Sequence, residues 1–257
     1  MPDSKRRFPS VCLALAACFA LLLPGCVKYK QTTTVMADGS GKMELVMGMS
    51  LAELARLGPE KDPFAALSVE ALAKNPQGFV AFTEPRARDV DGYRVVTVTG
   101  YFEDVNQLAF AGGGIGGDQE LESVSYTLAE SRLTVQRPLA GQAAAAFRDE
   151  PMSLENPELR RVLAPMLEGL ELEESFVVPG AVTSAGPLAA DGRRATASVA
   201  GAEVLDRHDA LLDAFAPLER LEIDFEPQAL SPSASEAWAR ELSDAKTDWA
   251  RLLGAGG

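Results

Sequence analysis

The sequence predicts an α+β fold in which a largely antiparallel sheet has helices packed on one face, after an N-terminal signal segment. Three observations support this class. Strand patterns come mostly as adjacent pairs joined by short turns, and helical patterns lie between the pairs. The composition, 47% hydrophobic and 24% charged, allows a substantial core and argues against wholesale disorder.

The first 25 residues have the pattern of a secretory signal. Lys5, Arg6 and Arg7 precede a run from Val11 to Leu23 that is almost entirely apolar, as in the basic and apolar regions of a signal peptide. An uncleaved membrane span is the alternative, but this run is shorter than the ~20 residues that a span needs. We therefore predict a signal peptide over residues 1–25 and an α+β envelope domain over residues 26–257.

The end of this segment, Leu23-Pro24-Gly25-Cys26, resembles the lipobox of bacterial lipoproteins. In that family the cysteine thiol receives diacylglycerol, the signal is cut off, and the new amino terminus is acylated with a fatty acid such as palmitate. The resemblance implies that Cys26 is the lipidation site and that acyl chains attach the protein to a membrane. Two or more chains make such anchoring stable.

The charge and the cysteine count exclude several classes of function. The chain carries 37 acidic and 24 basic residues, and an acidic surface repels nucleic acid, whose binding depends on Lys and Arg contacts. Cys12 and Cys18 lie in the signal segment, so an intramolecular disulfide is not expected in the mature domain. With one histidine and no spare cysteine, we expect neither a metal site nor a cofactor.

The first half of the mature chain predicts two hairpins with short helices between them. Alternating β-branched residues and a Gly-rich turn follow Cys26 almost directly, so the domain should sit close to the membrane. A capping-box pattern at Ser50 and a similar start at Ser68 indicate the helices. The expected strands are 29–36, 42–49, 78–83, 92–102, 121–129 and 132–137, with a turn at Asp38-Gly39-Ser40-Gly41 and helical turns within 103–110.

The second half predicts more helix. Asn156-Pro157 is typical of a helix start, and Pro165 should kink the helix that follows. Apolar residues on one face of that helix are Leu159, Val162, Leu163, Met166 and Leu167. The other expected elements are helices 139–147 and 204–215, strands 171–178, 193–199 and 218–225, and a last helix opened by Ser233-Ala234-Ser235-Glu236. The weakest seam between possible sub-domains is near Glu150-Pro151.

Several residue patterns invite a chemical interpretation, and each is better explained structurally. The run Gly112–Gly117 lacks the Gly-Lys-Ser/Thr ending of a phosphate loop, and His208 has neither a nucleophile nor an orienting partner. The acidic clusters are Glu171, Glu173 and Glu174 on a strand, and Asp206, Asp209 and Asp213 on a helix. Neither has calcium-loop spacing, and we interpret both as solvated faces, with Glu173 and Glu174 on opposite sides of their strand. We predict no catalytic residue and no enzyme activity.

Two apolar sets bear on ligand binding. Trp238, Leu242, Ala245, Trp249 and Leu252 form one helical stripe, which we expect to cover the domain's own core and not a lipid surface. Met43, Leu45, Met47 and Met49 alternate along one strand. Methionine adapts to irregular apolar partners, so an apolar or lipid ligand between the sheet and its helices is one hypothesis. The alternative is that these residues fill the core.

The opening of the mature chain is similar to that of LppM-type bacterial lipoproteins. The likeness covers Gly25-Cys26-Val27 and the first hairpin, and more loosely Pro179-Gly180, Asp191-Gly192 and helix 204–215. The chain departs from the family in lacking a tryptophan in strand 193–199 and the C-terminal transmembrane helix of some members. The resemblance implies an α+β envelope domain able to bind an apolar or lipid ligand, and it implies no catalytic residues.

The sequence therefore favours a non-enzymatic, lipid-anchored cell-envelope protein that acts as a binding or scaffold module, with a ligand or an envelope protein as partner. A membrane-anchored hydrolase that uses acidic residues is the alternative. Val27 follows Cys26, where lipoproteins of the inner membrane often have Asp. We expect the outer membrane, facing the periplasm, if the cell has two membranes, and otherwise the outer face of the cell membrane.

Overall fold

A computed structural model describes residues 27–58, 63–64, 67–74, 76–110, 124–137, 160–161, 164, 167, 169–207 and 220–255. Its first half contains β1 (Val27–Val35), β2 (Gly41–Ser50), α2 (Leu51–Leu57), α3 (Val69–Lys74), β3 (Ala81–Phe82), β4 (Arg86–Val90), β5 (Tyr93–Phe102), the 3-10 turn η3 (Val105–Gln107), β6 (Ala109–Phe110), β7 (Val124–Ala129) and β8 (Arg132–Gln136). Its second half contains β9 (Glu171–Val177), β10 (Gly180–Ser184), β11 (Ala189–Asp191), β12 (Arg194–Ala200), α6 (Gly201–Asp206), β13 (Arg220–Pro227) and α8 (Pro232–Ala255).

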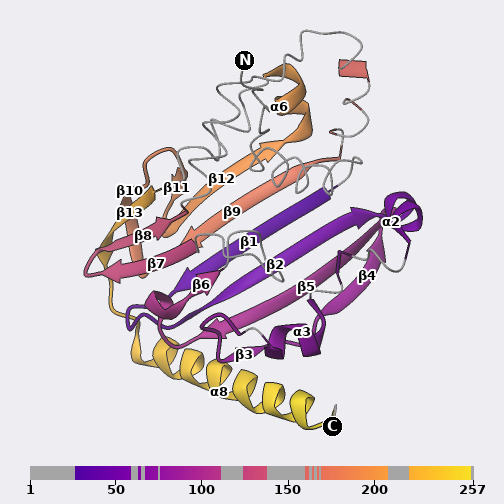
Figure 1. Ribbon diagram of the computed structural model, residues 1–257. Helices are drawn as coiled ribbons and strands as arrows, with labels where there is room; N and C mark the ends of the chain where they lie inside the picture. Colours follow the sequence, from indigo (N-terminus) through magenta and orange to yellow (C-terminus); the bar gives the residue numbers. More distant parts are fainter. Residues whose placement is uncertain are drawn as a thin grey trace, which may run out of the picture.

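Eight strands form the larger sheet, which we call sheet A, in the order β11-β12-β9-β1-β2-β5-β3, with β4 also paired to β5 (Figure 1). Strand β1 is parallel to β9, and the other strand pairs described in this sheet are antiparallel. The predicted α+β class with a largely antiparallel sheet is therefore confirmed. The parallel pairing joins segments on either side of residue 150.

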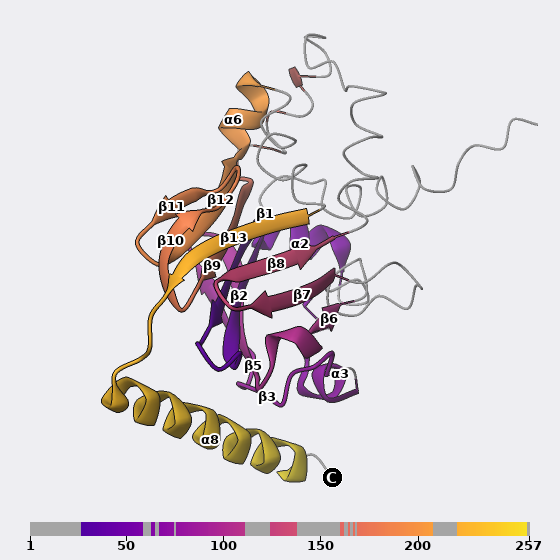
Figure 2. The ribbon, with the colours of Figure 1, turned by 90° about the vertical axis from the view of Figure 1, so that its left-hand side faces the viewer.

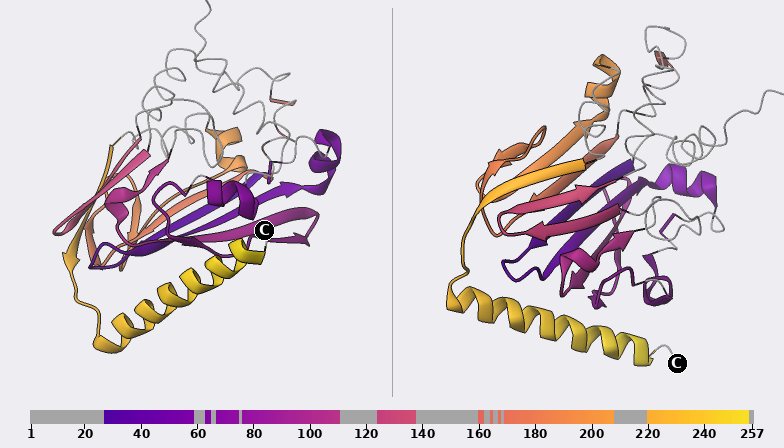
Figure 3. Two further views of the ribbon diagram at one scale, coloured as in Figure 1. Left: turned by 60° about the horizontal axis from the view of Figure 1, so that its bottom comes forward. Right: turned by 60° about the vertical axis from the view of Figure 1, so that its left-hand side comes forward.

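Five further strands form sheet B, in the order β10-β13-β8-β7-β6, and this sheet lies across one face of sheet A (Figures 2 and 3). A second sheet, and not helices alone, therefore covers the inner face. The sequence did not indicate this division, because strand periodicity shows which face of a strand is apolar but not which sheet the strand joins. Residues 150 and 151, where a seam was predicted, lie outside the described residues.

The core lies between the two sheets and follows the alternation of the strands. From β2, Met43, Leu45 and Met49 are buried and belong to the same hydrophobic cluster as Leu133 and Ile223 of sheet B. These methionines thus fill the core, as the alternative interpretation held. Of the apolar face predicted for residues 159–167, Leu167 is described, and it is buried.

The turn between β1 and β2 forms as predicted. The Asp38 carboxylate accepts hydrogen bonds from the Ser40 amide at 3.0 Å and from its hydroxyl at 2.5 Å, and Gly39 adopts φ +85°, a conformation that favours glycine. At Gly41 an added Cβ would lie 2.0 Å from the Thr34 carbonyl oxygen and 2.5 Å from the Phe102 ring. Ser40 is thereby held in a defined orientation.

The helix starts differ in detail from the predicted caps. At α2, Ser50 Oγ accepts from the Glu53 amide at 3.2 Å as predicted, but the Glu53 carboxylate pairs with Arg56. Helix α8 begins at Pro232, so Ser231, whose hydroxyl accepts from the Ala234 amide at 3.3 Å, takes the capping position that the prediction gave to Ser233. Proline suits the first helical position, so Pro232 starts the helix and the residue before it, Ser231, becomes the cap. The prediction did not take this preference into account.

Helix α8 lies along the β3 edge of sheet A (Figure 1). Its stripe faces the protein: Trp238 and Trp249 are buried, and Leu242, Ala245 and Leu252 pack on the same core. The predicted core-covering role of this stripe is confirmed. Within the described ranges, no helix combines the length and the apolarity that crossing a bilayer requires.

Strand β4 ends sheet A beside β3, and all five of its residues are exposed. Among the described strands it pairs with β5 alone. Its charged side chains, Arg86, Arg88 and Asp89, therefore stand at an open sheet edge, where unpaired backbone groups are accessible.

Replacing Trp249 with alanine should detach α8 from the sheet. The indole ring packs edge-on against Phe82, with ring centroids 5.3 Å apart, and loss of a buried aromatic ring costs about 3 kcal/mol or more. We expect urea denaturation to show this loss of unfolding free energy. Arg251→Ala, on the exposed side of the same helix, is the control and should change stability by less than about 0.5 kcal/mol. Equal effects would contradict this packing.

Candidate functional site

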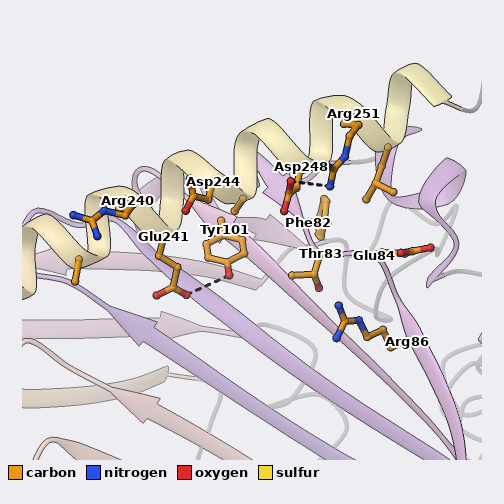
Figure 4. A pocket seen from close by; sticks show the side chains of 13 residues that line it. Phe82, Thr83, Glu84, Arg86, Tyr101, Arg240, Glu241, Asp244, Asp248 and Arg251 are labelled. Carbon is orange, nitrogen blue, oxygen red and sulfur yellow. Dashed lines mark hydrogen bonds and ion pairs between the residues drawn. The ribbon is translucent and has the colours of Figure 1, made fainter.

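A groove of about 530 Å³ runs between α8 and the β3–β4 edge of sheet A (Figure 4). Its floor is apolar, with Phe82, Ala245 and Leu252 among the residues that line it. Charged side chains stand along both walls, from α8 on one side and from Glu84 and Arg86, at the start of β4, on the other. We call this surface the α8 groove.

Two tryptophans hold α8 in place beside the groove. The Trp238 ring stacks on Tyr101 with centroids 6.2 Å apart, and its Nε1 donates to Ser40 Oγ at 2.8 Å. Trp249 anchors the other part of the helix on Phe82. The first hairpin thus positions the helix, because the Asp38 turn orients the Ser40 hydroxyl that accepts the hydrogen bond from the indole N–H.

Glu241 connects the helix to the sheet in the middle of the groove. Its carboxylate accepts hydrogen bonds from Lys42 Nζ at 2.9 Å and from the Tyr101 hydroxyl at 3.2 Å. Burial, and then the negative charge of Glu241, raises the pKa of Tyr101 to about 12. Tyr101 therefore remains a protonated donor at neutral pH, and its contact with Glu241 is a fixed polar group beside the apolar floor.

Four charged side chains in the groove make no ion pair within the described part of the chain: Glu84, Arg86, Arg240 and Asp244. Asp248 and Arg251 differ, since Arg251 NH2 lies 2.9 Å from Asp248 Oδ1. Unpaired charges of both signs above an apolar floor can receive an elongated ligand with charged and apolar groups. A polypeptide segment has this chemistry.

A second polar cluster lies between the sheets, around Arg137 and Glu174. Their side chains form an ion pair and are 15% and 9% exposed. Gln31 Nε2 donates to Glu174 Oε1 at 3.3 Å, and the Tyr29 hydroxyl donates to Gln31 Oε1 at 2.6 Å. The Arg137 guanidinium also lies 5.9 Å from the centre of the Phe176 ring. The cluster ties the end of β8 in sheet B to β1 and β9 in sheet A.

The protonation states in this cluster follow from burial and charge. Burial raises the pKa of Tyr126 to about 12 and that of Tyr29 further, so both phenols stay neutral. Burial by itself would lower the pKa of Arg137, but the negative charge of Glu174 outweighs it, and the net shift is upward. Arg137 is therefore charged and balanced by Glu174, and we assign the pair a structural role.

The acidic residues singled out from the sequence have different environments. Glu171 and Glu173 are surface groups paired with Lys28 at 3.1 Å and Lys30 at 2.7 Å. Glu174 points to the opposite side of the strand, as predicted, but the interpretation of the whole cluster as solvated is wrong for this buried residue. The alternation of the strand places Glu174 on the inner face of sheet A. A glutamate is normally exposed, so its burial was not predicted.

The other candidates fall partly outside the described residues. Asp206 is exposed and pairs with Arg160 at 3.3 Å. Cys26, Gly112–Gly117, His208, Asp209 and Asp213 lie outside the described residues. Among the residues that are described, no three or more His, Cys, Asp or Glu side chains are grouped so as to hold a metal ion.

Sequence analysis named Ala245 and Leu252 as part of the tryptophan stripe but did not identify the groove or its charged residues. Arg86 and Arg240 come from segments more than a hundred residues apart, and nothing in either segment indicates that they face the same space. The hypothesis of an apolar ligand between sheet and helix is not what this groove suggests, since its walls are charged. One local signal was available: the polar residues flanking the tryptophan stripe on α8 mark the two sides of the helix that border the sheet.

Comparison with known proteins gives little further information. No family model matches the sequence, and no curated protein matches it. Among solved structures, the NMR structure of the folded domain of LppM from Mycobacterium tuberculosis is similar, with a TM-score of 0.38 and 13% identity over 82% of this chain and 94% of that domain. This is a weak structural likeness to a lipoprotein domain, and it carries no argument about function.

Replacing Glu174 with glutamine should destabilise the domain strongly. The change leaves Arg137 buried without its counter-charge, which costs roughly 3 kcal/mol or more. Glu173→Gln is the matched control, because this neighbour points to the outer face and makes an exposed ion pair worth at most about 1 kcal/mol. Urea denaturation of the two variants would measure both losses, and equal losses would contradict the buried ion pair.

The double variant Arg137→Met, Glu174→Leu distinguishes an unpaired buried charge from lost packing. It removes both charges, and we expect it to recover most of the stability that Glu174→Gln loses. A double variant as unstable as Glu174→Gln would show that the two charges do not stabilise each other.

Proposed function

We propose that this protein is a lipid-anchored lipoprotein of the bacterial cell envelope that acts by binding, without enzyme activity. The observation that carries the proposal is the order Leu23-Pro24-Gly25-Cys26 followed at once by β1, which begins at Val27. A lipid on Cys26 would place the folded domain directly at a membrane. Acyl chains, and not a membrane-crossing helix, would then be the attachment.

The α8 groove is the surface we propose for binding. It combines an apolar floor with unpaired charges of both signs, and α8 is held over the sheet at Trp238, Glu241 and Trp249. A preformed groove limits the ordering that binding requires. Its occupant in this proposal is a polypeptide segment of an envelope protein, and an apolar or lipid ligand between the sheets and helices remains an alternative.

Replacing Cys26 with serine tests the anchor. A hydroxyl cannot take the place of the thiol as lipid acceptor, so we expect the variant to lose labelling by radioactive palmitate and to accumulate as an uncut precursor. The wild-type protein should fractionate with the outer membrane where the cell has two membranes. Normal maturation and labelling of the serine variant would exclude the lipobox.

Photo-crosslinking of this protein in the intact cell envelope tests whether the groove binds a partner. A benzoylphenylalanine at Asp244, inside the groove, should give a discrete protein adduct, whereas the same group at Ser243, exposed on α8 but outside the groove, should not. Charge reversal by Arg240→Glu should weaken the Asp244 adduct several-fold. Equal adducts from both positions, or an adduct insensitive to Arg240→Glu, would contradict binding in the groove.

A further inference from the structure

We infer that the domain stands end-on on the bilayer, with the start of β1 toward the lipid and the β1–β2 turn and the first part of α8 away from it. This inference rests on the proposed lipidation of Cys26. It adds what the anchor alone does not give, namely which surfaces meet the lipid and which face outward.

The residue that follows the proposed attachment point is fixed within the sheet. Val27 is the first residue of β1, is 6% exposed, and pairs with Met49 of β2. The next residue, Lys28, pairs with Glu171 of β9. Since consecutive Cα atoms are about 3.8 Å apart, a lipidated Cys26 cannot lie far from this end of sheet A.

Three other elements share this end of the sheet (Figure 1). Helix α2 begins directly after β2, and its Leu51 amide donates to the Gly92 carbonyl in the β4–β5 turn at 2.9 Å. Helix α6 follows Ala200, which pairs with Glu171 at the start of β9. We call α2, the β4–β5 turn and α6 the anchor end.

The opposite end lies one strand length away. Strand β1 has nine residues from Val27 to Val35, and the two ends are eight steps apart, which at about 3.3 Å per step is roughly 26 Å. The turn beyond Val35 contains Ser40, and Trp238 attaches the first part of α8 there. The Trp238 end of the groove therefore lies toward this outward end, whereas Arg86, which pairs with Thr97 of β5, lies near the middle of sheet A.

Charge and polarity oppose a flat arrangement of the sheet on the membrane. The chain has a net charge of −13, and an acidic surface is repelled by anionic lipid. The outer face of sheet A carries the ion pairs Lys28–Glu171 and Lys30–Glu173 and presents no net attraction. Among described residues the large apolar side chains that are exposed are Val80, Val90 and Leu253. Of these, Val90 adjoins the β4–β5 turn at the anchor end.

Fluorescence quenching tests this orientation in the full, mature protein. Because the mature sequence contains no cysteine besides Cys26, Ala52→Cys in α2 and Ala37→Cys before the β1–β2 turn each introduce one free thiol at an exposed alanine. Each purified variant is labelled with an environment-sensitive dye. It is then reconstituted in phosphatidylethanolamine–phosphatidylglycerol vesicles that contain a nitroxide-headgroup lipid.

We expect the label at Ala52 to lose most of its emission and the label at Ala37 to keep it. A third label, at Ala237 in the groove, should behave like Ala37. Equal quenching at all positions, or stronger quenching at Ala37, would overturn the orientation.

Mass spectrometry of the N-terminal peptide distinguishes failure of the proposed lipid anchor from failure of the proposed orientation. Full acylation with equal quenching rejects the orientation alone, whereas a bare Cys26 rejects the anchor and with it the orientation.

Discussion

The parallel pairing of β1 with β9 is the constraint on which the rest of the architecture depends. It brings together segments about 140 residues apart in the chain, as in the pair Lys28 and Glu171. Strand β1 thereby occupies the middle of sheet A, with β2, β5 and β3 on one side and β9, β12 and β11 on the other. Closing so long a loop costs entropy, which the burial shared by both sheets must offset.

The ion pair between Arg137 and Glu174 is a different kind of constraint. A buried charge pair contributes little net stability, because desolvation offsets most of the attraction. It does, however, penalise any arrangement of the two sheets in which either charge is left without its partner. Glu174 and Arg137 therefore favour one relative position of β8 and β9, while the apolar contacts around Leu133, Ile223 and Phe176 supply the stability.

Features set by local chemistry could be predicted from the sequence. The Asp38–Gly41 turn, the alternation of β2 and the tryptophan stripe of α8 depend on residues close together in the chain, and the structure bears them out. Division into two sheets, the burial of Glu174 and the groove could not be predicted in this way. Each depends on which distant segments meet, and one sequence contains no direct record of such contacts.

The groove shows this limit most clearly. Arg86 belongs to an edge strand and Arg240 to the last helix, and each by itself resembles an ordinary surface arginine. They line one surface because Trp238 and Trp249 fasten the helix beside that edge. The predicted stripe thus located the helix, but the function of its polar side became visible only beside β3 and β4.

The open edge at β4 has a consequence for a protein confined to a surface. Copies tethered at the same point of their fold would share one orientation and diffuse in two dimensions, so identical sheet edges would meet often. Uncharged edges in that situation would add strand to strand and form extended assemblies. The two arginines and the aspartate of this exposed strand make such stacking costly, and would thereby let anchored copies crowd together without polymerising.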